Sequence, residues 1–138
     1  MSHNLEVKDN KFSGIGLICD TVTPANRIYP RFVIEKALIE FQKKIEQNNA
    51  FLLTSKFDTF NGIDINSIIG LITSASLCGN EVIITGELLK TDYSKSFNNR
   101  TLHVFSGGYG CYDIDYDTQT VTMKDDFELE HFIVEERE

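Results

Sequence analysis

The sequence has no tryptophan, two prolines and three cysteines among its 138 residues. Cys19, Cys78 and Cys111 are odd in number, far apart and outside any Cys-x-x-Cys pair, which argues against a disulfide framework and against a zinc site. No apolar run approaches the ~20 residues of a membrane-spanning helix. The first residues also lack the apolar centre of a signal peptide. We therefore expect reduced thiols, no membrane contact, and neither a metal nor another cofactor.

Acidic residues outnumber basic ones, and the formal net charge is −8. Such a chain repels phosphate backbones and anionic lipids, so nucleic acid is not an expected partner. The acid is concentrated in the last quarter, in residues 113–117, 125–130 and 135–138. Charge runs of this kind form either a solvated rim or a docking surface for a basic partner. Both interpretations stay open at this point.

The length and the 41% hydrophobic content are typical of one globular domain with one core. We predict a flexible polar leader over residues 1–11, a single domain over 12–134 and an acidic tail over 135–138. A main helix is predicted to start at Pro30 and to stop at Asn48-Asn49, because apolar residues between them recur at helical spacing on one face. These residues are Ile34, Ala37, Leu38, Phe41 and Ile45.

Short β-strands are predicted over most of the remaining chain. Their segments are rich in β-branched and aromatic residues or alternate between polar and apolar side chains. Turn formers such as Cys78-Gly79-Asn80 separate them. The predicted strands are 12–19, 51–54, 67–74, 81–89, 101–106, 111–115, 121–124 and 127–134. The fold class is therefore α+β, mainly β: a small β-barrel or bent antiparallel sheet with one main packed helix.

Ser106 is followed by the glycine-rich segment 107–110, which allows two interpretations. The glycines form a tight turn after a strand, or their N–H groups form an oxyanion hole for a Ser106 nucleophile. A serine nucleophile needs a base within hydrogen-bond reach. His103 would point to the opposite face of a regular strand from Ser106, whereas His131 could approach it only through the fold.

Three carboxylates, Asp113, Asp115 and Asp117, alternate along an extended segment, as an oxygen-liganded cation would require. The segment is not an EF-hand loop, because Thr118 takes the place of the glycine and Lys124 that of the bidentate glutamate. We interpret it as an exposed strand and turn.

Several motifs resemble, in the same order, those of the prohead (capsid-maturation) serine proteases of tailed phages, the myovirus branch in particular. Asn26-Arg-Ile-Tyr-Pro30 leads into Val33-Ile-Glu-Lys-Ala-Leu38, which is similar to the family's Asn-Gly-Arg-x-Tyr-Pro loop and the amphipathic helix after it. The resemblance spans about residues 12 to 134. Its further motifs are Ile63 to Gly70 (the strand after the catalytic loop), Gly79 to Val82 with Gly86 to Thr91 (a hairpin), Val104 to Gly110 (the nucleophile segment) and Asp126 to Leu129 (the closing strand).

The resemblance implies a fold similar to that of the herpesvirus assembly proteases, a role in phage capsid assembly, and Ser106 as the match of the serine nucleophile. The family's catalytic histidine falls in a loop that corresponds to residues 55–61, which contain no histidine. Lys56 or Phe57 stands in its place. Gly107 stands where an arginine often follows the nucleophile. The motifs that shape the fold are therefore present, whereas the positions of the family's catalytic histidine and of its arginine hold other residues.

We accordingly expect a phage protein of the virion or host cytoplasm that binds coat or scaffold protein without peptidase activity, with self-association into a homo-oligomer as a further option. The alternative is an active serine peptidase that cleaves scaffold or coat protein, with Ser106 as nucleophile and Lys56, His103 or His131 as base. A third hypothesis is an unrelated module that binds a small ligand in an apolar pocket away from Ser106.

Overall fold

The computed structural model describes residues 3–54 and 65–135 of the chain. In chain order, the elements are β1 (Asn4–Lys8), β2 (Lys11–Ile18), β3 (Arg27–Ile28), α1 (Arg31–Glu46), β4 (Phe51–Thr54), the 3-10 turn η1 (Ile65–Ser67), β5 (Ile68–Cys78), β6 (Glu81–Leu88), α2 (Asp92–Lys95), β7 (Thr101–Tyr109), β8 (Tyr112–Asp115), β9 (Thr120–Met123) and β10 (Glu128–Glu135). Within the described ranges, none of the helices has the length and apolar character needed to cross a membrane.

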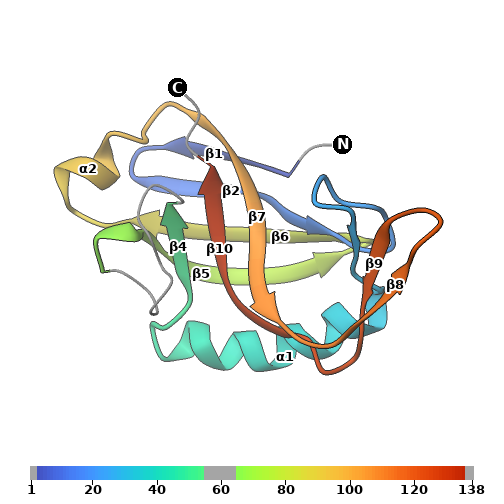
Figure 1. Ribbon diagram of the computed structural model, residues 1–138. Helices are drawn as coiled ribbons and strands as arrows, with labels where there is room; N and C mark the ends of the chain where they lie inside the picture. The colour runs from blue at the N-terminus through green and yellow to red at the C-terminus, as the bar shows by residue number, and fades with distance from the viewer. Residues whose placement is uncertain (1–2, 55–64, 136–138) are drawn as a thin grey trace.

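Seven of the described strands form a closed barrel in the order β1-β2-β6-β5-β4-β10-β7 (Figure 1). Neighbouring strands are antiparallel except β4 and β10, which run parallel with Leu52 beside Phe132. Closure pairs the edge strands that an open sheet would leave free. The inward side chains form the core, in which Leu5, Phe12 and Ile84 are almost fully buried. The predicted mainly-β fold with a small barrel and one main helix is confirmed, and its likeness to the herpesvirus proteases stays a prediction.

Helix α1 follows Pro30, which is its N-cap, and ends before Asn48, which has a φ of 56°. The predicted helix and its stop at Asn48-Asn49 are thereby confirmed. The helix buries the predicted apolar face, and the Phe41 ring meets the Phe132 ring edge-on with centroids 5.8 Å apart. Figure 1 shows α1 running below the barrel, where β10 passes in front and β5 behind.

The predicted flexible leader is corrected by the structure for residues 4–8, which form strand β1. This strand pairs with both β2 and β7, and Leu5 and Val7 are buried. The polar residues between them face outward, so the segment alternates as a half-buried strand does. At the other end, Glu135 closes β10, whereas residues 136–138 of the predicted acidic tail lie outside the described residues.

The predicted turn at residues 107–110 is wrong for its first three residues, because β7 continues to Tyr109 and pairs with β10. A Cβ on Gly107 would lie 2.5 Å from the His131 ring nitrogen Nε2, and one on Gly108 would overlap the Glu128 carbonyl oxygen. These glycines therefore do not reverse the chain. They leave room for the His131 ring and the Glu128 carbonyl of the neighbouring strand β10.

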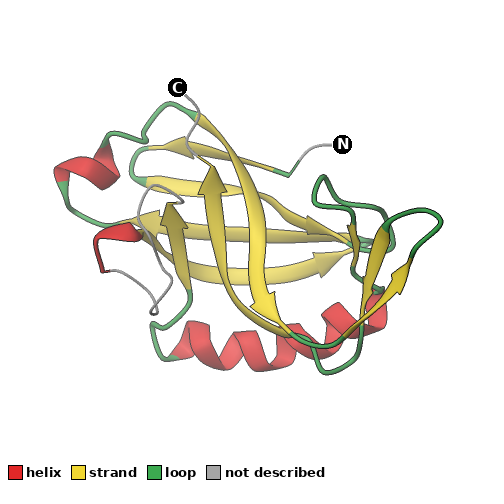
Figure 2. Ribbon diagram, viewed as in Figure 1, coloured by secondary structure: helices red, strands yellow, loops and turns green. Residues whose placement is uncertain are grey.

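A second sheet, in the order β3-β9-β8, lies outside the barrel. The predicted strands near residues 111–124 are confirmed as β8 and β9, and the short strand β3 lies within the Asn26-to-Pro30 motif. Figure 2 shows β8 and β9 as a hairpin that projects beyond the end of the barrel. We refer to residues 112–123 as the β8–β9 arm.

Candidate functional site

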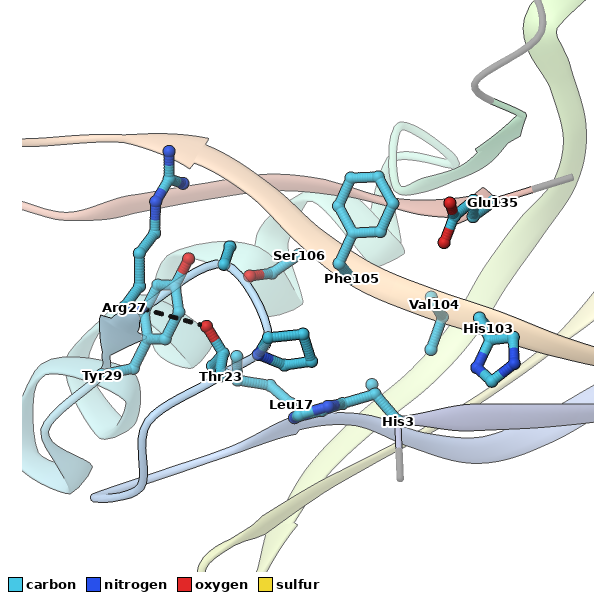
Figure 3. A pocket seen from close by; sticks show the side chains of 13 residues that line it. His3, Leu17, Thr23, Arg27, Tyr29, His103, Val104, Phe105, Ser106 and Glu135 are labelled. Atoms are coloured by element: carbon cyan, nitrogen blue, oxygen red, sulfur yellow. Dashed lines mark hydrogen bonds between the residues drawn. The ribbon is translucent and has the colours of Figure 1, made fainter. Parts of the chain in front are cut away.

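A cleft opens in the barrel wall where β1 is too short to fill the space between β2 and β7. The last β1 pairs are Leu5 with Gly14 of β2 and Asn4 with His103 of β7. Beyond them a cavity of about 640 Å³ lies between the two strands (Figure 3), and we call it the β2–β7 cleft. It is lined by His3, Gly16, Leu17, Thr23, Pro24, Ala25, Arg27, Tyr29, His103, Val104, Phe105, Ser106 and Glu135.

The loop that closes one side of the cleft is held by its own backbone. The Thr23 N–H donates to the Arg27 carbonyl at 2.8 Å, and the Asn26 N–H donates to the Thr23 carbonyl at 2.9 Å. Asn26 has a φ of 60°, a left-handed conformation that asparagine tolerates better than most residues. Tyr29, buried against the Phe127 ring, anchors the other end of the loop. The Asn26-to-Pro30 motif therefore shapes a wall of the cleft.

Ser106 lies at the cleft with its side chain on the inner face of β7. It is 9% exposed and stands opposite Phe132, which is fully buried. In Figure 3 its side chain points toward the loop that carries Thr23, whereas Phe105 points away from that loop. Among the described residues, no hydrogen bond involves the Ser106 hydroxyl. The predicted nucleophile is thus accessible from the cleft but stands without a described proton acceptor.

His103 also lines the cleft, but it lies three residues before Ser106 on the same strand and on its outer face. Three residues of an extended strand span about 10 Å, whereas a general base must come within about 3 Å of the hydroxyl it deprotonates. Figure 3 shows His103 further along β7, away from the Ser106 side chain. The structure does not bring these two residues together.

His131 lies on the outer face of the β7–β10 pair, on the side away from Ser106. It stands opposite Gly107, and its ring occupies the space a Gly107 side chain would fill. Successive strand residues point to opposite faces, so this ring and the Ser106 hydroxyl are on opposite sides of the barrel wall. The pKa of His131 is lowered, mainly by burial. The Glu130 carboxylate opposes this shift, and the Lys44 charge adds to it.

The predicted lysine base and the predicted oxyanion-hole glycines complete the candidate catalytic residues. Lys56, like the whole segment 55–61, lies outside the described residues. Gly107 and Gly108, the predicted oxyanion-hole residues, belong to a paired strand. Their backbone is part of the β7–β10 ladder rather than of a strand-ending turn.

His3 belongs to the cleft although the sequence interpretation placed it in a leader. Its carbonyl accepts a hydrogen bond from the Val104 N–H at 2.9 Å, so it extends the β1 pairing with β7. Burial lowers the pKa of His3, and its enclosed Nε2 has no hydrogen-bond partner among the residues that the structure describes. The alternation of Leu5 and Val7 with polar residues is the signal that would have identified this strand.

The three alternating aspartates do not form a cation site in the described part of the chain. Asp115 Oδ1 accepts hydrogen bonds from the N–H groups of Asp117 and Thr118 at 3.0 and 3.3 Å, which closes the turn after β8. Asp113 instead pairs with Lys124 at 3.5 Å. Across residues 3–54 and 65–135, no three His, Cys, Asp or Glu side chains converge as metal ligands.

Comparisons with known proteins find a likeness in structure alone. No protein-family model matches the chain, and no curated protein matches its sequence. The structure is similar to that of the bacteriophage T4 capsid assembly protease gp21, with a TM-score of 0.75 and 17% sequence identity. The match covers 92% of this chain and 81% of that one. The fold therefore resembles that of a phage capsid assembly protease.

Proposed function

We propose that this chain is a capsid or capsid-assembly protein of a tailed phage that acts by binding coat or scaffold protein and does not cleave peptides. Its place of action is then the assembling particle or the host cytoplasm. Support comes from the likeness to the T4 capsid assembly protease together with the prohead-protease motifs. The kinship with herpesvirus assembly proteases is part of the same proposal.

The observation that carries the proposal is the placement of Ser106. A serine hydroxyl is almost never ionised near neutral pH, so it needs a base in contact to act as a nucleophile. The ring of His131 lies across the barrel wall, and His103 lies about 10 Å along the strand. Losing the base lowers the rate of a serine peptidase by several powers of ten.

The proposal is tested by treating the protein with a fluorophosphonate probe and by incubating it with phage coat and scaffold chains. We expect no labelling of Ser106, no cleavage, and co-sedimentation of the protein with assembling particles. The Ser106→Ala variant should co-sediment as the parent does. Cleavage that Ser106→Ala abolishes would overturn the proposal.

The second candidate is an active serine peptidase, and it is favoured by the opening of Ser106 into a cleft. Lys56 is the base this candidate requires, since a lysine with a depressed pKa can accept the serine proton. If it holds, probe labelling of Ser106 should disappear in Lys56→Met and persist in the matched variant Lys90→Met. Labelling unaffected by Lys56→Met would remove this lysine from the mechanism.

A further inference from the structure

The outer edge of β8 has no strand partner within the described part of the chain. β8 pairs with β9 on one side, and no other strand of the described chain lies on its other side. All four residues of β8 are exposed. An edge of this kind presents a row of backbone N–H and C=O groups, which can bind another extended chain as an added strand.

The two faces of β8 differ in chemistry. Tyr112 and Ile114 stand opposite Met123 and Val121 of β9, which lie in the hydrophobic core or pack against it. The two β8 residues therefore continue the apolar face of β9 outward. They are nevertheless 53% and 44% exposed. Nothing in the described chain covers this continuation of the core beyond β9.

The opposite face of β8 is acidic. Asp113 and Asp115 stand opposite Thr122 and Thr120, and Asp117 follows in the turn. The one cation paired with them in the described chain is Lys124, at 3.5 Å from Asp113, with both side chains at least half exposed. Exposed pairs of this kind contribute little and are readily exchanged for another cation.

Charge decides which chain can occupy this edge. A second copy of the arm would set Asp113 and Asp115 against the same residues, and like charges directly opposite destabilise a strand pair. A strand with alternating basic and apolar residues would instead place its cations on the acidic face and its apolar groups on Tyr112 and Ile114. It would also continue the backbone ladder.

We propose that the free edge of β8 binds an extended basic segment of a partner protein, with lysine or arginine alternating with apolar residues, as an added strand. The coat or scaffold protein of the proposed function is the natural source of this segment. The surface lies on the arm, so its role does not depend on whether Ser106 is a nucleophile.

The test uses a capped peptide of alternating lysine and valine, about eight residues long, with one valine replaced by tryptophan. The protein has no tryptophan, so the indole emission reports the peptide alone. We expect binding that weakens between ~0.05 M and ~0.5 M salt, because the ion pairs are exposed. Amide signals of residues 112–118 should shift in the nuclear magnetic resonance spectrum.

Variants separate the contributions of charge and backbone. Asp113→Asn with Asp117→Asn should weaken binding about three- to tenfold, since each lost exposed pair contributes little. Asp115 is kept because its carboxylate closes the turn. Glu40→Gln with Glu46→Gln, at exposed positions of α1, removes the same number of charges away from the arm and should leave binding unchanged. Two further peptides carry methyl groups on every second backbone nitrogen, one on the odd and the other on the even positions. Only one of these two sets of N–H groups faces β8 in an added strand, so methylation should abolish binding of one peptide and not of the other.

Two outcomes would overturn the proposal. The first is that the lysine-valine peptide fails to bind; if the aspartate variants then also aggregate, the acids only protect the edge from self-association. Alternatively, both methylated peptides and a glutamate-valine peptide bind as well as the parent, which would mean that no strand is added. Failure of particle binding in the earlier test leaves this peptide result unaffected, so the two proposals fail separately.

Discussion

The barrel and the β8–β9 arm are built from similar strands, but they differ in what becomes of their edges and faces. Every barrel strand has a partner on both sides, and its inward side chains, such as Phe132 and Val134, are fully buried. The arm keeps an edge that no described strand pairs with, and Tyr112, Ile114 and Tyr116 are between 44% and 82% exposed. The difference indicates that stability resides in the barrel, whereas the arm is free to serve binding.

The largest expected effect comes from emptying the barrel core at Phe132. This ring contacts Phe41 of α1 and fills the space in front of Gly16, so Phe132→Ala removes one aromatic contact between helix and barrel and leaves a cavity in the core. We expect a loss of about 3–5 kcal/mol in the free energy of unfolding, measured by urea denaturation. The matched variant Phe32→Ala, at a residue 65% exposed, should change it by less than about 0.5 kcal/mol. Equal effects would contradict the assignment of stability to the barrel.

A smaller effect is expected from a methyl group added at Gly86 in β6. Its Cβ would overlap the Leu71 carbonyl oxygen and the Phe12 ring, and the carbonyl belongs to the neighbouring strand. Gly86→Ala should therefore lower the free energy of unfolding by about 1–3 kcal/mol, measured by the same titration. Ser76→Ala, at an exposed position of β5, is the control. A neutral Gly86→Ala would show that the two strands can separate without cost.

The pH dependence of stability tests the packing of His131 against β7. Because burial lowers its pKa in the folded state below the ordinary 6.5, the unfolded chain binds the proton first as the pH falls. The free energy of unfolding should decline below about pH 6.5, and His131→Gln should reduce that decline without removing it, since the pKa of His3 is lowered too. Thermal unfolding at about pH 8 and pH 5 measures the difference. An equal effect of the substitution at both pH values would rule out a buried neutral imidazole.

The smallest effect is expected from the arm. Ile114→Thr removes apolar surface that is already exposed and keeps a β-branched side chain, so the free energy of unfolding should change by less than about 0.5 kcal/mol. The same variant should weaken binding of the lysine-valine peptide, as a titration of its tryptophan emission would measure. A loss of stability as large as that of Phe132→Ala would mean that the arm belongs to the barrel core.

Local patterns were sufficient to predict most elements but not their neighbours. The stripe from Ile34 to Ile45 identified α1, because helical periodicity is a property of consecutive residues. The glycines after Ser106 predict either a turn or an oxyanion hole from sequence, since glycine permits both a chain reversal and close packing. Only the approach of β10, through His131 and Glu128, selects close packing.

By itself, the sequence determined the mainly-β class, the position of α1 and the absence of a Cys-x-x-Cys pair, while the match of Ser106 to a serine nucleophile stays a prediction from the resemblance. The tertiary structure decided that residues 4–8 complete a barrel, that Ser106 faces a cleft away from His131, and that β8 ends in an open edge. The reason is physical. Periodicity and composition act between residues close in the chain, whereas the register of strands far apart sets which face each side chain occupies.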